Sequence, residues 1–319
     1  MNNRAALVLG ATGGIGSEIA SRLVRSGWRV RAMARHVGQT AGMEWVGGDA
    51  MSASDVAAAA QGTSVIVHAV NPPGYRKWNE VVLPMIDNTI AAARREGARV
   101  VLPGTVYNFG PDAFEHPLDE TAAQAPVTRK GKIRVELEQR LEHGGVKALI
   151  VRAGDFFGPK AGSNWFGQLA KPGKPVRSIT YPGRRGVGHH WAYLPDVAET
   201  MVQLLERDAL ADFARFHMRG HWDADGTEMI GAIRRAMGED VPVRRFPWPI
   251  VWLASPFVPL FRELWEMRYL WSSRVEMRND RLVAELGAEP HTPLDEAVRT
   301  TLEGLNCLAP HGHEAAMPA

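Results

Sequence analysis

The chain has 319 residues, of which 45% are apolar, so it can bury a sizeable core as one large domain or as a core with a cap. Its formal net charge of +2 is nearly balanced and it carries no long basic run, which argues against a nucleic-acid partner. The single cysteine, Cys307, cannot form an internal disulfide, and no signal-peptide pattern precedes the first apolar run, so we expect a cytoplasmic protein.

Three glycines, Gly10, Gly13 and Gly16, lie between a short apolar run that begins at Ala6 and a helical pattern. Without a Cβ at Gly10 and Gly13 the backbone can turn tightly and approach a pyrophosphate, and free N–H groups at the start of a helix attract the anion. Such a triplet also suits an ordinary tight loop. A second strand at 28–34 completes a βαβ unit of about 30 residues, and this context favours a dinucleotide-binding turn.

The residues after the second strand favour NADP over NAD. An NAD site needs an acidic residue about 20 positions beyond the turn to bind the ribose 2′-hydroxyl. Here the strand ends Ala34-Arg35-His36, without a carboxylate. Arg35 can pair with a 2′-phosphate, although a solvated arginine at a strand end, as we interpret Arg31, is the alternative.

Short runs rich in valine and isoleucine then alternate with helical patterns. Further strands are predicted at 43–49, 64–70, 98–104 and 146–152, and helices at 54–60, 81–96 and 133–143. This alternation predicts an α/β Rossmann fold, a doubly wound parallel sheet with helices on both faces.

The second half of the chain is looser and rich in glycine and proline. It contains a predicted strand at 189–193, a helix at 196–206 and a last core strand at 213–218. The predicted organisation is a dinucleotide-binding core at 1–160, interleaved cap loops and last core strands at 161–219, a mainly helical substrate cap at 220–305 and a disordered tail at 306–319. Such a cap would cover the carboxyl ends of the strands, where ligands of these sheets bind.

The apolar stretch 246–261 is shorter than the roughly 20 apolar residues needed to span a bilayer, and it carries four prolines, so we expect no membrane span. An apolar lid or a dimer contact is favoured over a dip into the membrane surface, because the basic face of an interfacial helix is missing. No metal site is predicted, since His311 and His313 lie in the tail without further ligands nearby.

Several motifs occur in a characteristic order along nearly the whole chain. They are Gly10-Ala-Thr-Gly-Gly-Ile-Gly16, Gly48-Asp49, Val65-Ile-Val-His68-Ala69, Pro103-Gly-Thr105-Val-Tyr107-Asn-Phe-Gly110, Lys132 with Glu136, Arg152-Ala-Gly-Asp155-Phe-Phe-Gly-Pro159, Tyr193-Leu-Pro-Asp196-Val-Ala198 and the region 280–298. Together they resemble the extended or atypical short-chain dehydrogenase/reductase superfamily, in its NAD-dependent epimerase/dehydratase branch.

The resemblance implies roles for individual residues. Thr105 would polarise a substrate oxygen, Lys132 would hold the nicotinamide ribose, and Asp49 would contact the adenine. The cofactor contacts so implied are Gly10, Thr12, Gly13, Gly14, Ile15, Gly16, Arg35, Asp49, His68, Ala69 and Lys132. A small-molecule substrate is implied as well, and a homodimer formed by a pair of helices is usual in that superfamily.

One position departs from the superfamily pattern. Its acid/base tyrosine, four residues before the lysine, is replaced by Thr128, and no tyrosine lies between Tyr107 and Tyr181. A threonine hydroxyl lacks the acidity of a phenol, so proton transfer of the tyrosine type is in doubt. Lys130 competes with Lys132 for the role of the lysine.

Three other residues could handle the proton. His189 and His190 begin a predicted strand, and because strand side chains alternate, at most one of them can face the pocket. Asp155 follows the sixth strand at the carboxyl edge, where it could act in catalysis or bond the next turn. The loop 71–78 either contacts the substrate or is a rigid surface loop.

Two functions remain open. The first is an NADP-dependent oxidoreductase, or an epimerase/dehydratase-like enzyme, acting on a small carbonyl or alcohol. Its substrate would be apolar or aromatic if two or three cap tryptophans, among those at 222, 248, 252, 265 and 271, face the cleft. The second is a non-catalytic NADP-binding redox sensor or regulatory protein, which retention of the glycine turn beside loss of the tyrosine would fit.

Overall fold

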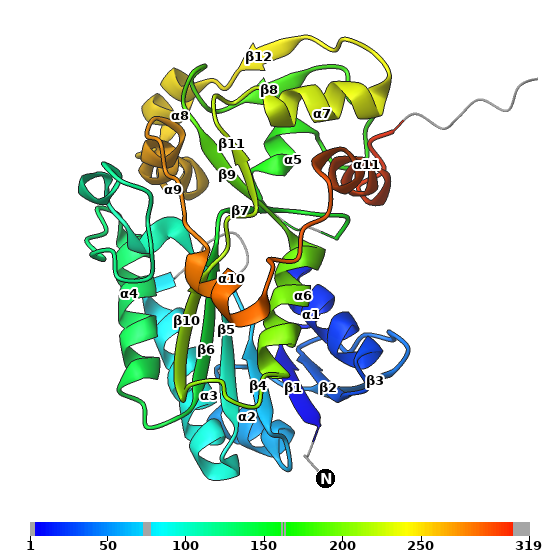
Figure 1. Cartoon of the computed structure of the whole chain (residues 1–319), viewed down its shortest axis with the longest axis vertical. Coiled ribbons are helices and arrows are strands. Elements are labelled where there is room, and N and C mark those ends of the chain that lie inside the picture. Colours follow the sequence, from blue (N-terminus) through cyan, green and yellow to red (C-terminus); the bar gives the residue numbers. More distant parts are fainter. Residues whose placement is uncertain (1–3, 73–77, 161, 163, 309–319) are drawn as a thin grey trace, which may run out of the picture.

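The computed structural model describes residues 4–72, 78–160, 162 and 164–308, and it contains one sheet of seven parallel strands (Figure 1). The order across the sheet is β10-β6-β5-β4-β1-β2-β3. The strands are β1 (Ala5–Leu9), β2 (Arg29–Ala34), β3 (Met43–Gly47), β4 (Val65–His68), β5 (Arg99–Thr105), β6 (Ala148–Ala153) and β10 (Phe213–His217). The chain moves outward from β1 first to one side and then to the other, which confirms the predicted doubly wound fold.

Helices cover both faces of this sheet. On one face α1 (Gly14–Arg25) packs against α6 (Leu194–Leu205), and on the other α2 (Ala53–Ala60), α3 (Trp78–Glu96) and α4 (Arg129–Glu142) lie side by side (Figure 1). Each layer shares an apolar cluster with the strands beneath it. The central strands are apolar at consecutive positions because both of their faces are covered.

The cap lies beyond the carboxyl ends of these strands (Figure 1). It contains a three-stranded sheet, β11-β9-β7, and a two-stranded sheet, β12-β8. Their bounds are β7 (Asp155–Phe157), β8 (Ile179–Tyr181), β9 (His189–Tyr193), β11 (His221–Asp223) and β12 (Val243–Arg245), and the cap helices are α5 (Phe166–Leu169), α7 (Glu228–Met237), α8 (Trp248–Ala254), α9 (Pro259–Glu266) and α11 (Leu294–Gly304). The predicted strand at 189–193 therefore belongs to a small sheet of the cap, and the one at 213–218 is the last strand of the core.

Helix α10 (Asp280–Leu286) returns to the core, although the predicted cap includes its residues. It packs against β10 and α6, and its Leu282 is fully buried in the apolar cluster on that face. The chain thus leaves the cap to cover one edge of the sheet and re-enters it at α11 (Figure 1).

The stretch 246–261 forms α8 and part of α9 at the edge of the cap. Several of its apolar side chains are largely uncovered, with Phe257 85% and Leu253 71% exposed. Within the described part of the chain, no helix combines the length and apolarity that crossing a membrane requires. A lid or dimer contact here stays a prediction. Residues 309–319 of the predicted tail lie outside the described residues, as do residues 73–77 of the loop 71–78.

Candidate active site

The glycine turn connects β1 to α1 at the middle of the carboxyl edge. Gly10 has a φ of +83°, and a Cβ there would lie 2.5 Å from the carbonyl oxygen of Ala69. Gly13 donates its N–H to the Gly10 carbonyl at 2.9 Å, and a Cβ on Gly16 would lie 2.2 Å from that same oxygen. A Cβ would clash at positions 10 and 16, so both positions require glycine. Without side chains there, the backbone of the turn can lie close to a bound ligand.

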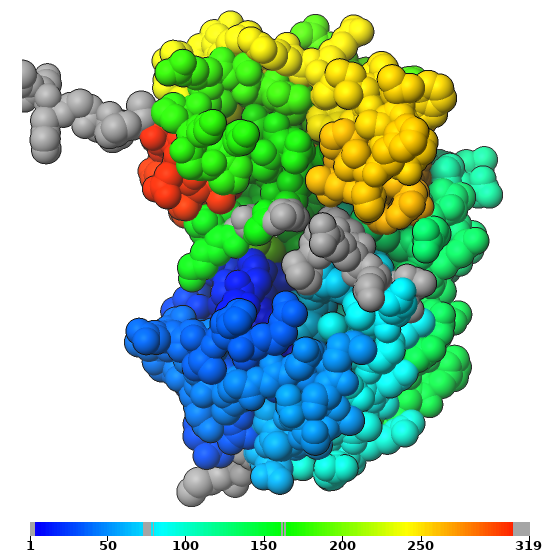
Figure 2. Space-filling view, turned by 180° about the vertical axis from the view of Figure 1, so that it is seen from behind, coloured from blue at the N-terminus to red at the C-terminus, as the bar shows by residue number. Residues whose placement is uncertain are grey.

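The first turn of α1 leaves its N–H groups without side-chain caps. Gly13 is the N-cap residue and makes no side-chain cap, and no acidic residue lies in the first turn. The Ser17 hydroxyl donates to the Gly14 carbonyl at 3.0 Å. Uncapped N–H groups and the positive end of the helix dipole suit an anion. The turn therefore fits the diphosphate of a dinucleotide. In the space-filling view, the N-terminal region that contains the turn borders the cap near the middle of the molecule (Figure 2).

The side chains that would surround the adenosine end are held in different ways. Arg35 follows β2 and is exposed, whereas Arg31 pairs with Glu44 at 3.2 Å. Asp49 is half-buried, and its Oδ1 accepts the N–H of Met51 at 3.0 Å. Asp55 accepts the N–H of Asp49 at 3.0 Å, which fixes the loop after β3. Arg35 is thus free to meet a phosphate, whereas Asp49 sits in an ordered turn.

The imidazole of His68 faces α3. Its Nδ1 lies 2.8 Å from the Thr89 hydroxyl, and burial together with the nearby Arg134 lowers the pKa of His68 to about 3. The next residue, Ala69, follows β4, and its main chain lies against the glycine turn at Gly10. A contact between the His68 ring and the cofactor stays a prediction that the geometry does not favour.

Tyr107, Asp155 and His189 form a hydrogen-bonded chain at the carboxyl edge. The Tyr107 hydroxyl donates to Asp155 Oδ1 at 3.3 Å, and His189 Nε2 lies 2.9 Å from Asp155 Oδ2. Tyr107 lies in a 3-10 helix directly after β5, while Asp155 and His189 begin the neighbouring strands β7 and β9. Three segments distant in sequence thereby place a phenol, a carboxylate and an imidazole together.

The Asp155–His189 end of this chain of groups is shielded from water. Asp155 and His189 are both buried, and the imidazole stacks on the indole of Trp271 with ring centroids 3.7 Å apart and an interplanar angle of 10°. Trp191 meets the same imidazole edge-on at 4.9 Å. Hydrogen bonds are stronger in such a low-dielectric setting. The two indoles also pack against the imidazole and so hold the His189 ring in its orientation toward Asp155.

Thr105 ends β5 close to this group. Its Oγ1 accepts the N–H of Tyr107 at 3.3 Å and caps the 3-10 helix at 106–108. Because the oxygen accepts that bond, the hydroxyl hydrogen remains available for another acceptor. A half-buried Thr105 can therefore donate to a substrate oxygen from the position that the sequence motifs imply.

Thr128 has a structural task. Its hydroxyl accepts the N–H of Gly131 at 3.0 Å as the N-cap of α4, and the side chain is buried. Lys132 is exposed one turn later. Lys130 is buried instead, with its Nζ 3.1 Å from the Glu263 carboxylate, and burial lowers its pKa. The position of the usual acid/base tyrosine is thus occupied by a helix cap.

His190 lies on the other face of β9, as strand alternation requires. Its ring packs edge-on against Trp222 with centroids 4.8 Å apart, and Nε2 accepts the N–H of Met277 over 3.4 Å between the two nitrogens. Burial lowers the pKa of His190 to about 3, so the ring is neutral near pH 7. The structure therefore joins His189, and not His190, to Asp155.

Two contacts of this group are not among the sequence-based predictions: the hydrogen bond from Tyr107 to Asp155 and the stacking of Trp271 on His189. A signal for Tyr107 was available: it follows Thr105 by two residues at the same sheet edge that carries Asp155. The position of Trp271 had no such signal, because tertiary folding alone brings it to β9.

Comparisons with known proteins identify the family and the fold of the chain. A family model described as NAD(P)H-binding matches residues 10–208. The comparison with curated protein sequences found no match. Similar solved structures include MoeE5 in complex with UDP-glucose and NAD (TM-score 0.74, 18% identity, covering 95% of this chain and 98% of that one) and the UDP-glucose 4-epimerase of Thermus thermophilus in complex with NAD (TM-score 0.71, 19% identity, 95% and 99%). The enzyme WbmH of Bordetella bronchiseptica in complex with NAD+ has a TM-score of 0.72 at 17% identity, with 95% and 98% covered. At these identities the likeness establishes the fold.

Proposed function

Because this chain belongs to the NAD(P)H-binding family and has the epimerase/dehydratase fold of the extended short-chain dehydrogenase/reductase superfamily, we propose that it is an oxidoreductase using NADP on a small carbonyl or alcohol. One observation carries the catalytic part of this proposal, the hydrogen-bonded chain from the half-buried Tyr107 to the buried Asp155 and His189, beside the edge where ligands of such sheets bind. This chain offers groups for proton transfer in a protein that has Thr128, the N-cap of α4, at the position of the superfamily's acid/base tyrosine.

In the proposed mechanism the nicotinamide, when bound, supplies or accepts the hydride. Thr105 holds the substrate oxygen with its hydroxyl. In the reductive direction Tyr107 turns its hydroxyl hydrogen from Asp155 to that oxygen and gives it up as a proton, and an imidazolium at His189 replaces this proton through the Asp155 carboxylate. The reverse direction returns the proton along the same path.

Apolar rings surround the imidazole end of this group. The indole of Trp271 stacks on the His189 imidazole, and the indole of Trp165 packs against Trp271 with ring centroids 5.2 Å apart. These rings pack in the cap core, so the apolar or aromatic character of the small substrate stays a prediction from the sequence. MoeE5, which was solved with UDP-glucose, shares the fold with this chain, and a sugar nucleotide is therefore the competing substrate class to include in an assay.

Replacing Tyr107 by phenylalanine tests the proposal. We expect kcat to fall about 10²-fold, the lower end of the usual contribution of a positioned acid or base, while the Kd for NADP stays unchanged. The measurement is NADPH oxidation across a panel of apolar, aromatic and sugar-nucleotide carbonyls. Tyr193→Phe is the matched control, since it removes a phenol hydroxyl from β9, the strand that carries His189, outside the hydrogen-bonded chain.

Two outcomes would count against the proposed reaction. Full activity of Tyr107→Phe would remove Tyr107 from the proton path. Tight NADPH binding by the wild type without turnover of any panel member would favour the non-catalytic redox sensor, for which the loss of the usual tyrosine is the supporting observation.

Arg35 decides the cofactor preference in our proposal. Arg35→Ala is expected to raise the Kd for NADP about 10- to 100-fold, because a hydrogen bond to a charged group contributes about 1.5–3 kcal/mol, and to leave the Kd for NAD within about twofold. Calorimetric titration with both nucleotides measures this. His36→Ala is the control at the neighbouring exposed position, and equal wild-type affinity for the two nucleotides would refute the preference.

A further inference from the structure

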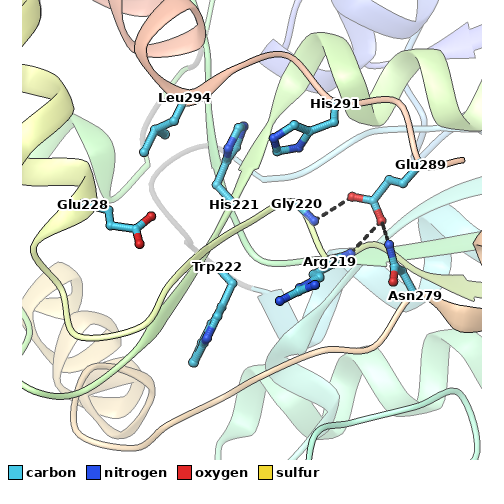
Figure 3. Close-up of a pocket in the computed structure, with 9 residues that line it drawn as sticks. All are labelled: Arg219, Gly220, His221, Trp222, Glu228, Asn279, Glu289, His291 and Leu294. Carbon is cyan, nitrogen blue, oxygen red and sulfur yellow. Dashed lines mark hydrogen bonds between the residues drawn. The ribbon is translucent and has the colours of Figure 1, made fainter.

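A pocket of about 400 Å³ lies between the small sheet of the cap and the segment that leads into α11 (Figure 3). Its lining residues are Arg219, Gly220, His221, Trp222, Glu228, Asn279, Glu289, His291 and Leu294. None of these residues belongs to the Tyr107–Asp155–His189 chain or to the glycine turn. The pocket is polar on the side where the rings of His221 and His291 face each other (Figure 3).

Three potential metal ligands meet beside this pocket. Asp196 lies in the first turn of α6, His221 begins β11, and His291 lies in the loop before α11. One ligand atom of each lies within 4.8 Å of the other two. Tetrahedral bonds of about 2.0 Å place ligand atoms about 3.3 Å apart, so small side-chain rotations would complete such a site.

In the described part of the chain, the buried imidazole of His221 has a nitrogen without a hydrogen-bond partner, which is an independent reason to expect a ligand here. The side chain is only 7% exposed, yet its Nε2 has no hydrogen-bond partner among the residues that the structure describes. The His291 ring lies 4.5 Å away by centroid. The lone pair of a neutral imidazole nitrogen can bind a cation. A buried nitrogen without a partner is costly unless something occupies it.

The groups around the cluster orient its members. Thr292 donates to both oxygens of Asp196, from its N–H at 2.8 Å and from its hydroxyl at 2.7 Å. Each carboxylate oxygen retains a further lone pair for a metal. Supporting hydrogen bonds of this kind are typical around metal-binding carboxylates.

The backbone fixes His221 as well. Its residue pairs with Trp191 across β11 and β9, and Gly220, with a φ of +53°, allows the close approach because a Cβ there would lie 2.4 Å from the Trp191 carbonyl. Glu289 accepts the N–H groups of Arg219 and Gly220 at 2.8 and 2.7 Å, as the dashed lines in Figure 3 show. Its carboxylate is thus engaged in holding the loop and is not counted among the ligands.

We propose that Asp196, His221 and His291 bind a divalent cation of the zinc type, with the remaining coordination position open to the pocket. Two imidazoles and one carboxylate form a donor set that zinc accepts, and a fourth position filled by water or a pocket ligand completes a tetrahedron. The ion ties α6 of the core to β11 and to the loop before α11.

Metal titration of the full-length protein tests this inference. After dialysis against a chelator, the untagged wild type is titrated with ZnCl₂ by calorimetry, and Co²⁺ is added separately to record the visible spectrum of four-coordinate cobalt. We expect one tight site per chain, and a thermal unfolding midpoint that rises with Zn²⁺ concentration because the ion binds the folded state.

His291→Ala is the decisive variant because His291 is exposed and its removal leaves the packing intact. It should weaken Zn²⁺ binding at least 100-fold and abolish the tetrahedral cobalt spectrum, while the exposed His116→Ala leaves both unchanged. Asp196→Asn gives a second test that keeps the side-chain volume. The absence of stoichiometric Zn²⁺ binding by the wild type, or equal binding by His291→Ala, would overturn the proposal.

Discussion

The Gly16→Val variant is expected to lose nucleotide binding by about 10³-fold or more. The added Cβ would lie 2.2 Å from the carbonyl oxygen of Gly10, so the backbone must move. That oxygen also accepts the N–H of Gly13, and displacing it opens the turn that faces the diphosphate. Hydrogen bonds from N–H groups to a charged acceptor contribute about 1.5–3 kcal/mol each, so the loss of two gives an effect of this size.

Calorimetric titration with NADP measures this loss, and circular dichroism reports whether the variant is folded. Gly167→Val in α5 is the matched control, because a Cβ there meets its nearest neighbour at an ordinary 3.6 Å. Gly16→Ala carries the same clashing atom with the least added volume, and it checks the result if the valine variant fails to fold. Unchanged affinity in either folded variant would mean that the nucleotide does not bind at this turn.

The second large effect concerns a buried ion pair in the core. Glu138 of α4 accepts a hydrogen bond from Arg152 Nε of β6 at 3.1 Å, and Asn108 donates to the same carboxylate at 2.9 Å. Arg152 also donates to His217 Nε2 at 3.2 Å, and that ring is neutral because burial and Arg152 lower the pKa of His217 to about 3. These partners of Glu138 are therefore positioned for a carboxylate.

We expect Glu138→Gln to lower the free energy of unfolding by about 3–5 kcal/mol, because it leaves the fully buried Arg152 charge without its counterion. Since whole domains are stable by only about 5–15 kcal/mol, the variant should be close to unfolding. Urea unfolding followed by circular dichroism measures the difference.

Glu142→Gln on the same helix is the control. Its side chain is 45% exposed and pairs with Arg215 at 3.4 Å, so about 0–1 kcal/mol is expected. A Glu138→Gln variant as stable as this control would show that the buried pair is not needed for stability. Joint replacement of Glu138 and Arg152 by leucine and methionine should recover much of the loss, since apolar residues of similar volume can substitute for buried ions.

The core could be predicted from sequence because its signals are local. Runs such as Ala148-Leu-Ile-Val are apolar at consecutive positions because both faces of the strand are buried. The glycine turn is equally local, because its three glycines lie within seven consecutive residues between a strand and a helix. The short strands β7, β8, β11 and β12 have three residues each, too few for a period to be visible. The sequence pattern there therefore predicts only loops or a helical region.

The chemistry of the sites was harder to predict because it is assembled from distant segments. Asp155 and His189 are each candidates on their own, but nothing in the sequence pairs them, since their contact depends on the register of β7 against β9. The same holds for His221 and His291, whose ring centroids lie 4.5 Å apart although no local spacing links them. The sequence identifies Thr128 as a departure from the superfamily pattern, but its use as a helix cap depends on where α4 begins.

The return of α10 from the cap to the edge of the core has a consequence for motion and unfolding. Because Leu282 is buried against the core while α11 rejoins the cap, the polypeptide crosses the boundary between the two parts repeatedly. Opening and closing of the cap over a ligand must therefore bend several connecting segments at once and cannot swing on one linker. Core and cap are interwoven, and they should melt as a single cooperative unit.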